Sequence, residues 1–296
     1  MKNKILILGA TGFIGRNMAE YFLKDKNNQI FATFNKKKPF RHKKIKWIKC
    51  DLRKNNLDNL FKGIDIIIQA AATTSGAKII KKKPYVHVTD NAIMNSRILR
   101  SLLNSNIKQF IFFSCTVMYQ SSSKSLKEKD FSESDNIYPN YYGVGWTKVY
   151  IEKMCKFYSE ISNTKFTIIR HSNIYGPYDK FDLEKSHVFG ATITKVMKAK
   201  KKIEVWGKGL ESRDFLFVDD LCKFVSLAIK NQKSNYEIYN AGSGKPVKIR
   251  DLVKLIVNYS KKKIKIEYDI NKPNINTNVH LNCDKAKKHL RWEPKT

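Results

Sequence analysis

The chain begins with a short apolar run that passes into a glycine-rich turn, and this arrangement constrains its fold most. Residues 4–8 are followed by Gly9-Ala10-Thr11-Gly12-Phe13-Ile14-Gly15, a G-x-x-G-x-x-G pattern that leads into a helical segment. Glycines let a backbone turn tightly and approach a diphosphate, and the helix start offers unpaired N–H groups to the anion. A turn that serves packing alone is the alternative. In this context the pattern predicts a dinucleotide site with contacts from Gly9, Thr11, Gly12, Phe13, Ile14 and Gly15.

Short apolar runs alternate with helical patterns through the first half of the chain. The runs expected to form buried strands are 4–8, 29–34, 46–50, 65–70, 109–114 and 166–170. Helical patterns, such as 17–24 and 91–104, lie between them. Continuously apolar strands joined by helices favour a parallel sheet that is covered on both faces. We therefore expect an α/β protein with a Rossmann-type, doubly wound parallel sheet.

The charge of the chain is strongly positive, with 57 basic residues against 26 acidic ones and a formal net charge of +31. Such a charge suggests nucleic acid as a partner. The basic residues are mostly lysines spread along the whole chain, whereas nucleic-acid faces favour arginine for bidentate contacts. We therefore interpret the lysine runs as solvated surface and expect no nucleic-acid partner. The positive field still favours an anionic substrate.

Five cysteines are scattered along the chain without a C-x-x-C pair: Cys50, Cys115, Cys155, Cys222 and Cys283. This spacing predicts reduced thiols, with neither a disulfide framework nor a metal site. No apolar run approaches the ~20 residues needed to cross a bilayer. The apolar run near the first residue is too short for the core of a signal peptide. We expect a cytoplasmic protein that does not associate with a membrane.

The residues after the second and third expected strands bear on the choice of cofactor. An acidic side chain after the second strand binds the ribose 2′-hydroxyl of NAD, whereas basic side chains accommodate the 2′-phosphate of NADP. This chain has Asn35 and Lys36 there, followed by two more lysines and no carboxylate. NADP(H) is therefore favoured over NAD(H). Asp51, after the third strand, either accepts a hydrogen bond from the adenine amine or is an ordinary turn residue.

Several further motifs resemble those of the extended short-chain dehydrogenase/reductases over residues 3–257. The resemblance is carried by the glycine turn, Asp51-Leu52, Ala70-Ala71-Ala72, Asn91, Arg170-His171-Ser172-Asn173-Ile174-Tyr175-Gly176-Pro177, Arg213-Asp214-Phe215-Leu216-Phe217-Val218-Asp219-Asp220 and Tyr239-Asn240-Ala241-Gly242. Together these motifs are similar to the nucleotide-sugar epimerase, dehydratase and reductase branch. Ser186-His187-Val188 and Val205-Trp206-Gly207-Lys208-Gly209 most resemble enzymes of the GDP-L-fucose synthase type.

The resemblance implies a dinucleotide-binding domain of about seven strands and a smaller, discontinuous α+β lobe that binds substrate. The expected boundaries are residues 1–172 plus about 214–245 for the domain, and about 173–213 plus 246–296 for the lobe. By the same resemblance, Leu52, Ala70, Ala71, Ala72, Asn91 and Lys148 join the cofactor contacts. Family members commonly form homodimers through two helices from each subunit.

The family's catalytic centre pairs a tyrosine with a lysine four residues later on one helix. The lysine lowers the pKa of the tyrosine, which then transfers a proton while the nicotinamide carries hydride. Here Lys148 matches the lysine, but position 144 is valine and Tyr142 lies six residues away. A continuous helix would separate Tyr142 and Lys148 by roughly 240° around its axis. We therefore expect Tyr142 to reach the site from a loop, with the helix beginning after Gly143 or Gly145; a packing role is the alternative.

The strand-end hydroxyl of the family is displaced as well. Cys115 stands at the matching position, and its thiol is a weak hydrogen-bond donor. Ser114 and Thr116 flank it, and we favour Thr116, although Cys115 could also be an inert buried thiol. The resemblance assigns His187 as an acid for epimerisation next to a ketone. The family's cysteine partner of that histidine is replaced here by Val117.

On the substrate side we expect Asn173, His187, Lys195, Trp206 and Arg213. The resemblance places Arg213 on the substrate diphosphate, which its planar guanidinium suits; a salt bridge with Asp214 or Asp219 is the alternative. Trp206 either stacks on a base or fills the core of the small lobe. The sequence thus predicts an NADP(H)-dependent enzyme that reduces or epimerises a nucleotide-activated sugar, with a GDP-linked deoxy sugar as one such substrate. The alternatives are a dinucleotide-sensing binding protein and, more remotely, an RNA-binding member of the family.

Overall fold

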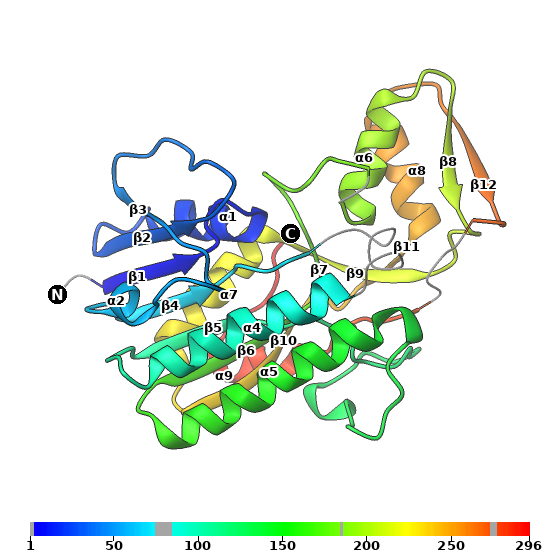
Figure 1. The fold of residues 1–296 in the computed structure, drawn as a ribbon. Helices are drawn as coiled ribbons and strands as arrows, with labels where there is room; N and C mark the ends of the chain where they lie inside the picture. Colours follow the sequence, from blue (N-terminus) through cyan, green and yellow to red (C-terminus); the bar gives the residue numbers. More distant parts are fainter. Residues whose placement is uncertain (1–2, 75–84, 184–185, 273–276) are drawn as a thin grey trace.

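The computed structural model describes residues 3–74, 85–183, 186–272 and 277–296. Its main sheet has seven parallel strands in the order β10-β6-β5-β4-β1-β2-β3 (Figure 1). The strands are β1 (Asn3–Leu8), β2 (Asn28–Phe34), β3 (Ile45–Lys49), β4 (Ile66–Gln69), β5 (Gln109–Phe113), β6 (Lys165–His171) and β10 (Tyr236–Ala241). The six strands expected from apolar runs are confirmed, and so is the Rossmann-type architecture.

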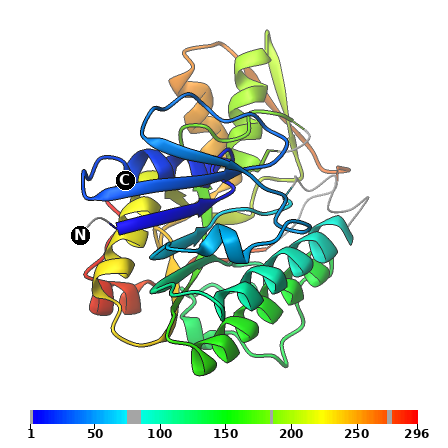
Figure 2. The ribbon, with the colours of Figure 1, turned by 60° about the vertical axis from the view of Figure 1, so that its left-hand side comes forward.

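Helices cover both faces of the main sheet, which is why its strands are apolar on both sides. One face carries α1 (Phe13–Phe22), α7 (Val218–Asn231) and α9 (Asp284–Leu290). The other carries α2 (Asp58–Phe61), α4 (Tyr85–Leu102) and α5 (Tyr142–Ile161). Figure 2 shows α4 and α5 running side by side over their face. No helix among the described residues is long and apolar enough to span a membrane.

A smaller lobe stands beside the carboxyl ends of the main strands (Figure 1). It consists of α6 (Val188–Lys198), α8 (Ile249–Tyr259) and the parallel pair β8 (Lys202–Trp206) and β12 (Lys265–Asp269). Residues such as Val196, Val205 and Val253 give it a core of its own. A three-stranded sheet, β11-β9-β7, links the lobe to the main domain; its strands are β7 (Asn173–Tyr175), β9 (Ser212–Phe217) and β11 (Pro246–Lys248). Two short 3-10 helices, η1 (Glu128–Asp130) and η2 (Pro139–Tyr141), complete the described elements.

The end of the chain departs from the expected domain boundaries. Residues up to 296 were expected in the small lobe, but α9 and the segment after it pack on the main domain. Trp292 is fully buried in the core beside α7, and its Nε1 donates a 3.0 Å hydrogen bond to the carbonyl of Asp220. The backbone N–H groups of Lys295 and Thr296 donate to the Asp220 carboxylate. Burial of this large indole therefore holds the segment after α9 against the main domain.

Candidate active site

The glycine turn between β1 and α1 lies at the carboxyl edge of the main sheet. Gly9 has a positive φ of 75°, and a Cβ there would lie 2.6 Å from the Cα of Ala71. A Cβ on Gly15 would lie 2.4 Å from the carbonyl oxygen of Gly9, so this glycine lets α1 pack against the turn. Gly12 is different, because it is exposed and meets only the carbonyl of Gly9 at 3.2 Å. Gly12 is therefore the position where a ligand can approach the backbone.

The first turn of α1 fits a diphosphate. Gly12 caps the helix without a side-chain hydrogen bond, and the first turn contains no acidic residue. Unpaired N–H groups at such a helix start attract an anion. Thr11, Phe13 and Ile14 are half-buried around this position. These features suit the dinucleotide that the glycine pattern predicts.

The loop after β4 forms the neighbouring wall of this site. Ala70 and Ala71 are half-buried and Ala72 is exposed. Asn91 of α4 holds the loop by accepting from the Thr73 N–H at 2.9 Å and donating to the Thr73 carbonyl at 3.0 Å. Its amide also donates to the carbonyl of His87. The Asn91 side chain is buried, and both of its N–H groups are used in these bonds, so it positions the loop.

The far edge of the site contains an arginine that sequence reasoning missed. The guanidinium of Arg53 binds both carboxylate oxygens of Asp51, at 3.1 and 2.9 Å, and a carboxylate oxygen of Asp90 at 2.7 Å. These bonds with Arg53 hold the pKa of Asp51 well below its usual range. Asn35 and Lys36 are exposed beside this group, whereas Leu52 is buried in the hydrophobic core.

Lys148 lies at the centre of the candidate active site. Its Nζ donates a 2.7 Å hydrogen bond to the carbonyl of Phe113, at the end of β5, and lies 4.6 Å from the ring centre of Phe112. Burial lowers the pKa of Lys148, while Cys115 and Glu152 counteract this effect. The Cys115 thiol therefore lies within electrostatic reach of the Lys148 ammonium. Burial raises the pKa of that thiol.

The three residues after β5, Ser114, Cys115 and Thr116, lie in different environments. The Ser114 hydroxyl is buried and donates to Oε1 of Glu152 at 2.5 Å. Glu152 in turn forms a buried ion pair with Arg170 at 2.7 Å. Ser114 is thus committed to a structural network and does not offer a hydroxyl to the site. Thr116 and Cys115 are half-buried beside it.

The expectation that Tyr142 stands in a loop before the helix is wrong. Tyr142 is the first residue of α5, so the helix continues unbroken from it to Lys148. Its side chain is 62% exposed and packs edge-on against Trp146. The ring lines an outer hollow of about 540 Å³ with Gln120, Asn136, Ile137, Tyr138 and Pro139. Helical geometry therefore turns Tyr142 away from the face that carries Lys148.

The preceding residue, Tyr141, was missed by sequence reasoning and faces the site. Burial raises the pKa of its hydroxyl, and the nearby Arg213 guanidinium lowers it. The same hydroxyl lies within electrostatic reach of Cys115. The spacing of seven residues from Tyr141 to Lys148 would place both on one helix face only if the helix included Tyr141, and α5 begins at Tyr142. Cys115 is thus a common neighbour of Tyr141 and Lys148.

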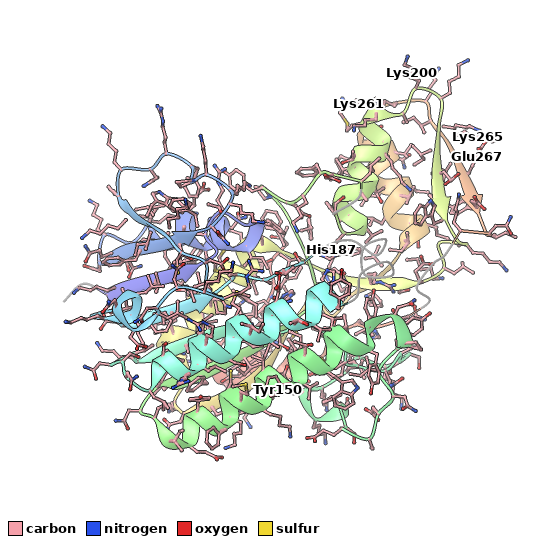
Figure 3. All side chains as sticks on the ribbon, viewed as in Figure 1. Tyr150, His187, Lys200, Lys261, Lys265 and Glu267 are labelled. Atoms are coloured by element: carbon pink, nitrogen blue, oxygen red, sulfur yellow. The ribbon has the colours of Figure 1, made fainter. Side chains whose placement is uncertain are left out.

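Two histidines face the same region from different parts of the fold. His171, also missed, ends β6, and the carbonyl of Ser172 accepts a 2.7 Å hydrogen bond from its Nδ1. Burial, with smaller contributions from charge on Lys148 and His187, lowers the pKa of His171 to about 4. His187 caps the start of α6 and lies between the main domain and the small lobe (Figure 3). Desolvation by the surrounding protein, with a smaller contribution from the Lys180 ammonium, lowers the pKa of His187, although the residue keeps access to solvent.

The expected substrate residues fall into two groups. Asn173 and Arg213 lie on neighbouring strands β7 and β9, where Asn173 donates to the carbonyl of Asp214 at 3.1 Å. Among the described residues, the Asp214 carboxylate is not an ion-pair partner of Arg213. It instead accepts four hydrogen bonds, from Ser243, Gly244 and Leu281. Burial lowers the pKa of Arg213.

The second group lies on the small lobe. The Lys195 ammonium is 5.4 Å from the ring centre of Trp206 and donates to the carbonyl of Glu204 at 2.9 Å. Trp206 is 40% exposed and its Nε1 donates to the Glu204 carboxylate, so it does not fill the lobe's core. Because the Trp206 indole is exposed beside a cation, stacking on the base of a nucleotide remains the prediction for this residue.

Comparison with known proteins identifies a protein family for this chain. The family model described as "NAD dependent epimerase/dehydratase family" matches residues 5–242. The GDP-L-colitose synthase of Yersinia pseudotuberculosis is 26% identical over 91% of this chain and 86% of its own length. The GDP-L-fucose synthase of Sinorhizobium fredii is 27% identical over 78% of this chain and 74% of its own length. A crystal structure of UDP-glucuronic acid 4-epimerase from Bacillus cereus, with UDP-glucuronic acid and NAD, aligns with a TM-score of 0.84 at 23% identity, covering 99% of this chain and 94% of the other.

Proposed function

Because the chain belongs to the NAD dependent epimerase/dehydratase family, we propose that it is an NADP(H)-dependent enzyme that reduces or epimerises a nucleotide-activated sugar. The observation that carries the proposal is the position of Lys148, whose Nζ binds the Phe113 carbonyl at the end of β5, two residues before Cys115. Tyr141, at the start of α5, lies within electrostatic reach of Cys115 and Arg213. Ligands of open α/β sheets bind at the carboxyl ends of the strands. The relatives named for GDP-L-colitose and GDP-L-fucose synthesis support a GDP-linked sugar.

We assign the proton-transfer hydroxyl to Tyr141 in place of Tyr142. A bound nicotinamide would supply hydride transfer at the sugar carbon. The Tyr141 hydroxyl would take the proton from the sugar hydroxyl, or return it, while the Arg213 cation stabilises the tyrosinate. Lys148 would hold the nicotinamide ribose from its anchor on Phe113. Thr116, Cys115 and His187 remain candidates for contacts with the sugar.

The preference for NADP rests on the loop after β2. Asn35 and Lys36 are exposed there and no carboxylate is present to bind a 2′-hydroxyl, so a 2′-phosphate is favoured. The family description and the Bacillus cereus structure both name NAD. Isothermal titration with NADPH and NADH tests the preference. Lys36→Glu is expected to weaken NADPH binding about tenfold and not to weaken NADH binding, because a carboxylate there can accept from the ribose 2′-hydroxyl; an equal loss for both would contradict the preference.

We further propose a homodimer formed through α4 and α5. Ile93, Tyr150, Phe157 and Ile161 are exposed on these two helices, and Tyr150 points away from the sheet (Figure 3). Exposed apolar side chains gathered on one face mark an interaction site. Light scattering should give a dimer for the wild type and a monomer for Tyr150→Lys with Phe157→Lys. Leu255→Lys, on the small lobe, is the matched control and should remain dimeric.

Product analysis tests the enzymatic assignment. The purified chain is incubated with NADPH or NADP and with GDP-mannose, UDP-glucose or their 4-keto derivatives, and products are identified by mass spectrometry and NMR. Conversion of a GDP-linked sugar is the expected result. Tight dinucleotide binding without conversion of any sugar would contradict an enzyme and favour a dinucleotide-sensing protein.

A further inference from the structure

The far end of the small lobe carries a dense group of lysines. The segments 195–203 and 252–266 together contain ten lysines and neither Asp, Glu nor Arg. These segments adjoin, because β8 and β12 pair in parallel with Lys202 opposite Lys265. We call residues 197–202 and 259–265 the lysine tip. Figure 3 shows Lys200 and Lys261 at this tip, at the opposite end of the lobe from His187.

Some of these lysines have evident structural partners. The Nζ of Lys262 donates to the carbonyls of Val196, Met197 and Ala199, which closes the carboxyl end of α6. Lys202 and Lys265 pair with Glu267 at 3.0 and 3.3 Å. The local fold therefore accounts for three of the lysines.

The other five lysines of the tip are exposed, and four of them, Lys200, Lys201, Lys261 and Lys263, lie in its two lysine runs. Across the described residues, no carboxylate forms an ion pair with any of them. Their mutual repulsion is thus not offset within the chain. A surface of this kind is complementary to an anionic partner.

Exposed apolar side chains accompany the lysines. Tyr259, the last residue of α8, is 82% exposed, and Met197 near the end of α6 is 61% exposed. The two residues lie at the same end of the lobe, since Lys262 reaches from just beyond Tyr259 to the Met197 carbonyl. Water-exposed apolar groups between cations favour a partner that offers both anionic charge and an apolar interior.

In contrast to the expectation from the sequence that the chain does not associate with a membrane, we propose that the lysine tip docks on the surface of an anionic phospholipid bilayer. Groups of roughly four to eight lysines bind anionic headgroups, and buried apolar side chains add to such binding. Tyr259 and Met197 would enter the headgroup region while the four lysines contact lipid phosphates and carboxylates. A nucleic acid is disfavoured because neither segment contains the arginine that suits bidentate phosphate contacts. Docking leaves the candidate active site free, and the proposal is independent of the proposed enzymatic function.

Co-sedimentation with lipid vesicles tests the proposal. The full chain should bind vesicles containing about 30% phosphatidylserine, fail to bind pure phosphatidylcholine, and lose affinity as salt rises. The variant Lys200→Glu, Lys201→Glu, Lys261→Glu, Lys263→Glu should bind at least tenfold more weakly. Its matched control, Lys24→Glu, Lys26→Glu, Lys43→Glu, Lys44→Glu, has the same net charge and should bind far better. Lys262 is kept, so the end of α6 remains closed.

Two further measurements distinguish docking by the tip from attraction by the positive charge of the whole chain. Tyr259→Ser should weaken vesicle binding several-fold even in high salt, because it removes only the apolar contact. Thermal unfolding of each variant verifies that the lobe is folded. Equal loss in both quadruple variants would overturn the proposal, since the general field of the chain would then account for the binding. Absence of vesicle binding, or tighter binding of a short oligouridine RNA through the same four lysines, would overturn it as well.

Discussion

The carboxylate of Glu152 and the guanidinium of Arg170 form an ion pair at 2.7 Å, with only 4% of each side chain exposed. Ser114 and Tyr119 add hydrogen bonds to this pair beneath the candidate active site. Burial alone would lower the pKa of Arg170, but Glu152 raises it above its usual value. The two charges can therefore remain buried beneath the candidate active site only while both partners are present.

Removing one partner should be costly. Arg170→Met or Glu152→Met is expected to lower the free energy of unfolding by about 3–5 kcal/mol, because the remaining charge is left buried without a partner. The double variant should lose less than the sum of the two. Urea unfolding of all four proteins gives the coupling energy, and additive losses would contradict this coupling.

Tyr141 and Tyr142 provide a matched pair for testing the acid–base assignment. Tyr141→Phe should lower kcat about 100-fold or more, as expected for loss of a general acid–base group. Tyr142→Phe should stay within about threefold of the wild type, since its hydroxyl points outward. Steady-state kinetics on the sugar identified by product analysis decides between them. A large loss in Tyr142→Phe alone would return the proton-transfer role to Tyr142.

Substitution of Gly12 should affect ligand binding, whereas substitution of Gly15 should affect the stability of the fold. Gly12→Ala places a methyl group where the diphosphate would approach, so the Kd for NADPH should rise at least tenfold with little loss of stability. Gly15→Ala forces α1 away from the Gly9 carbonyl and should lower the free energy of unfolding by about 1–3 kcal/mol. Calorimetry and urea unfolding measure the two effects. Unchanged NADPH binding in Gly12→Ala would argue against the dinucleotide site.

His171 makes stability depend on pH. Its pKa falls from 6.5 to about 4 on folding, so the unfolded chain binds the proton more readily. The contribution of neutral His171 is therefore fully present above pH 6.5 and is lost as the pH falls toward 4. The loss should be on the order of 2 kcal/mol. Urea unfolding should show that the free energy of unfolding falls less between pH 7 and pH 4.5 for His171→Asn than for the wild type. The control variant His42→Asn changes an exposed histidine and should show the same decrease as the wild type.

Much of the main domain could be predicted because its apolar runs are continuous and its first turn is specific. β10 was not identified as a strand, since Tyr236–Ala241 mixes polar and apolar residues, and only its end carried a recognised motif. The end of the chain was assigned to the wrong part of the fold because the burial of Trp292 depends on tertiary contacts with α7. Sequence spacing alone could not orient the helix start, where one residue separates an inward Tyr141 from an outward Tyr142.

The path of the chain also determines what a shortened protein could keep. The lobe built from α6 and α8 is inserted in the sequence between elements of the main domain. After the lobe, α9 and the segment that follows it pack on the main domain through Trp292 and Asp220. A deletion that advances from the last residue would unravel the half that holds the glycine turn before it reached the lobe. The buried Trp292 indole thus fastens the segment after α9 to the cofactor half.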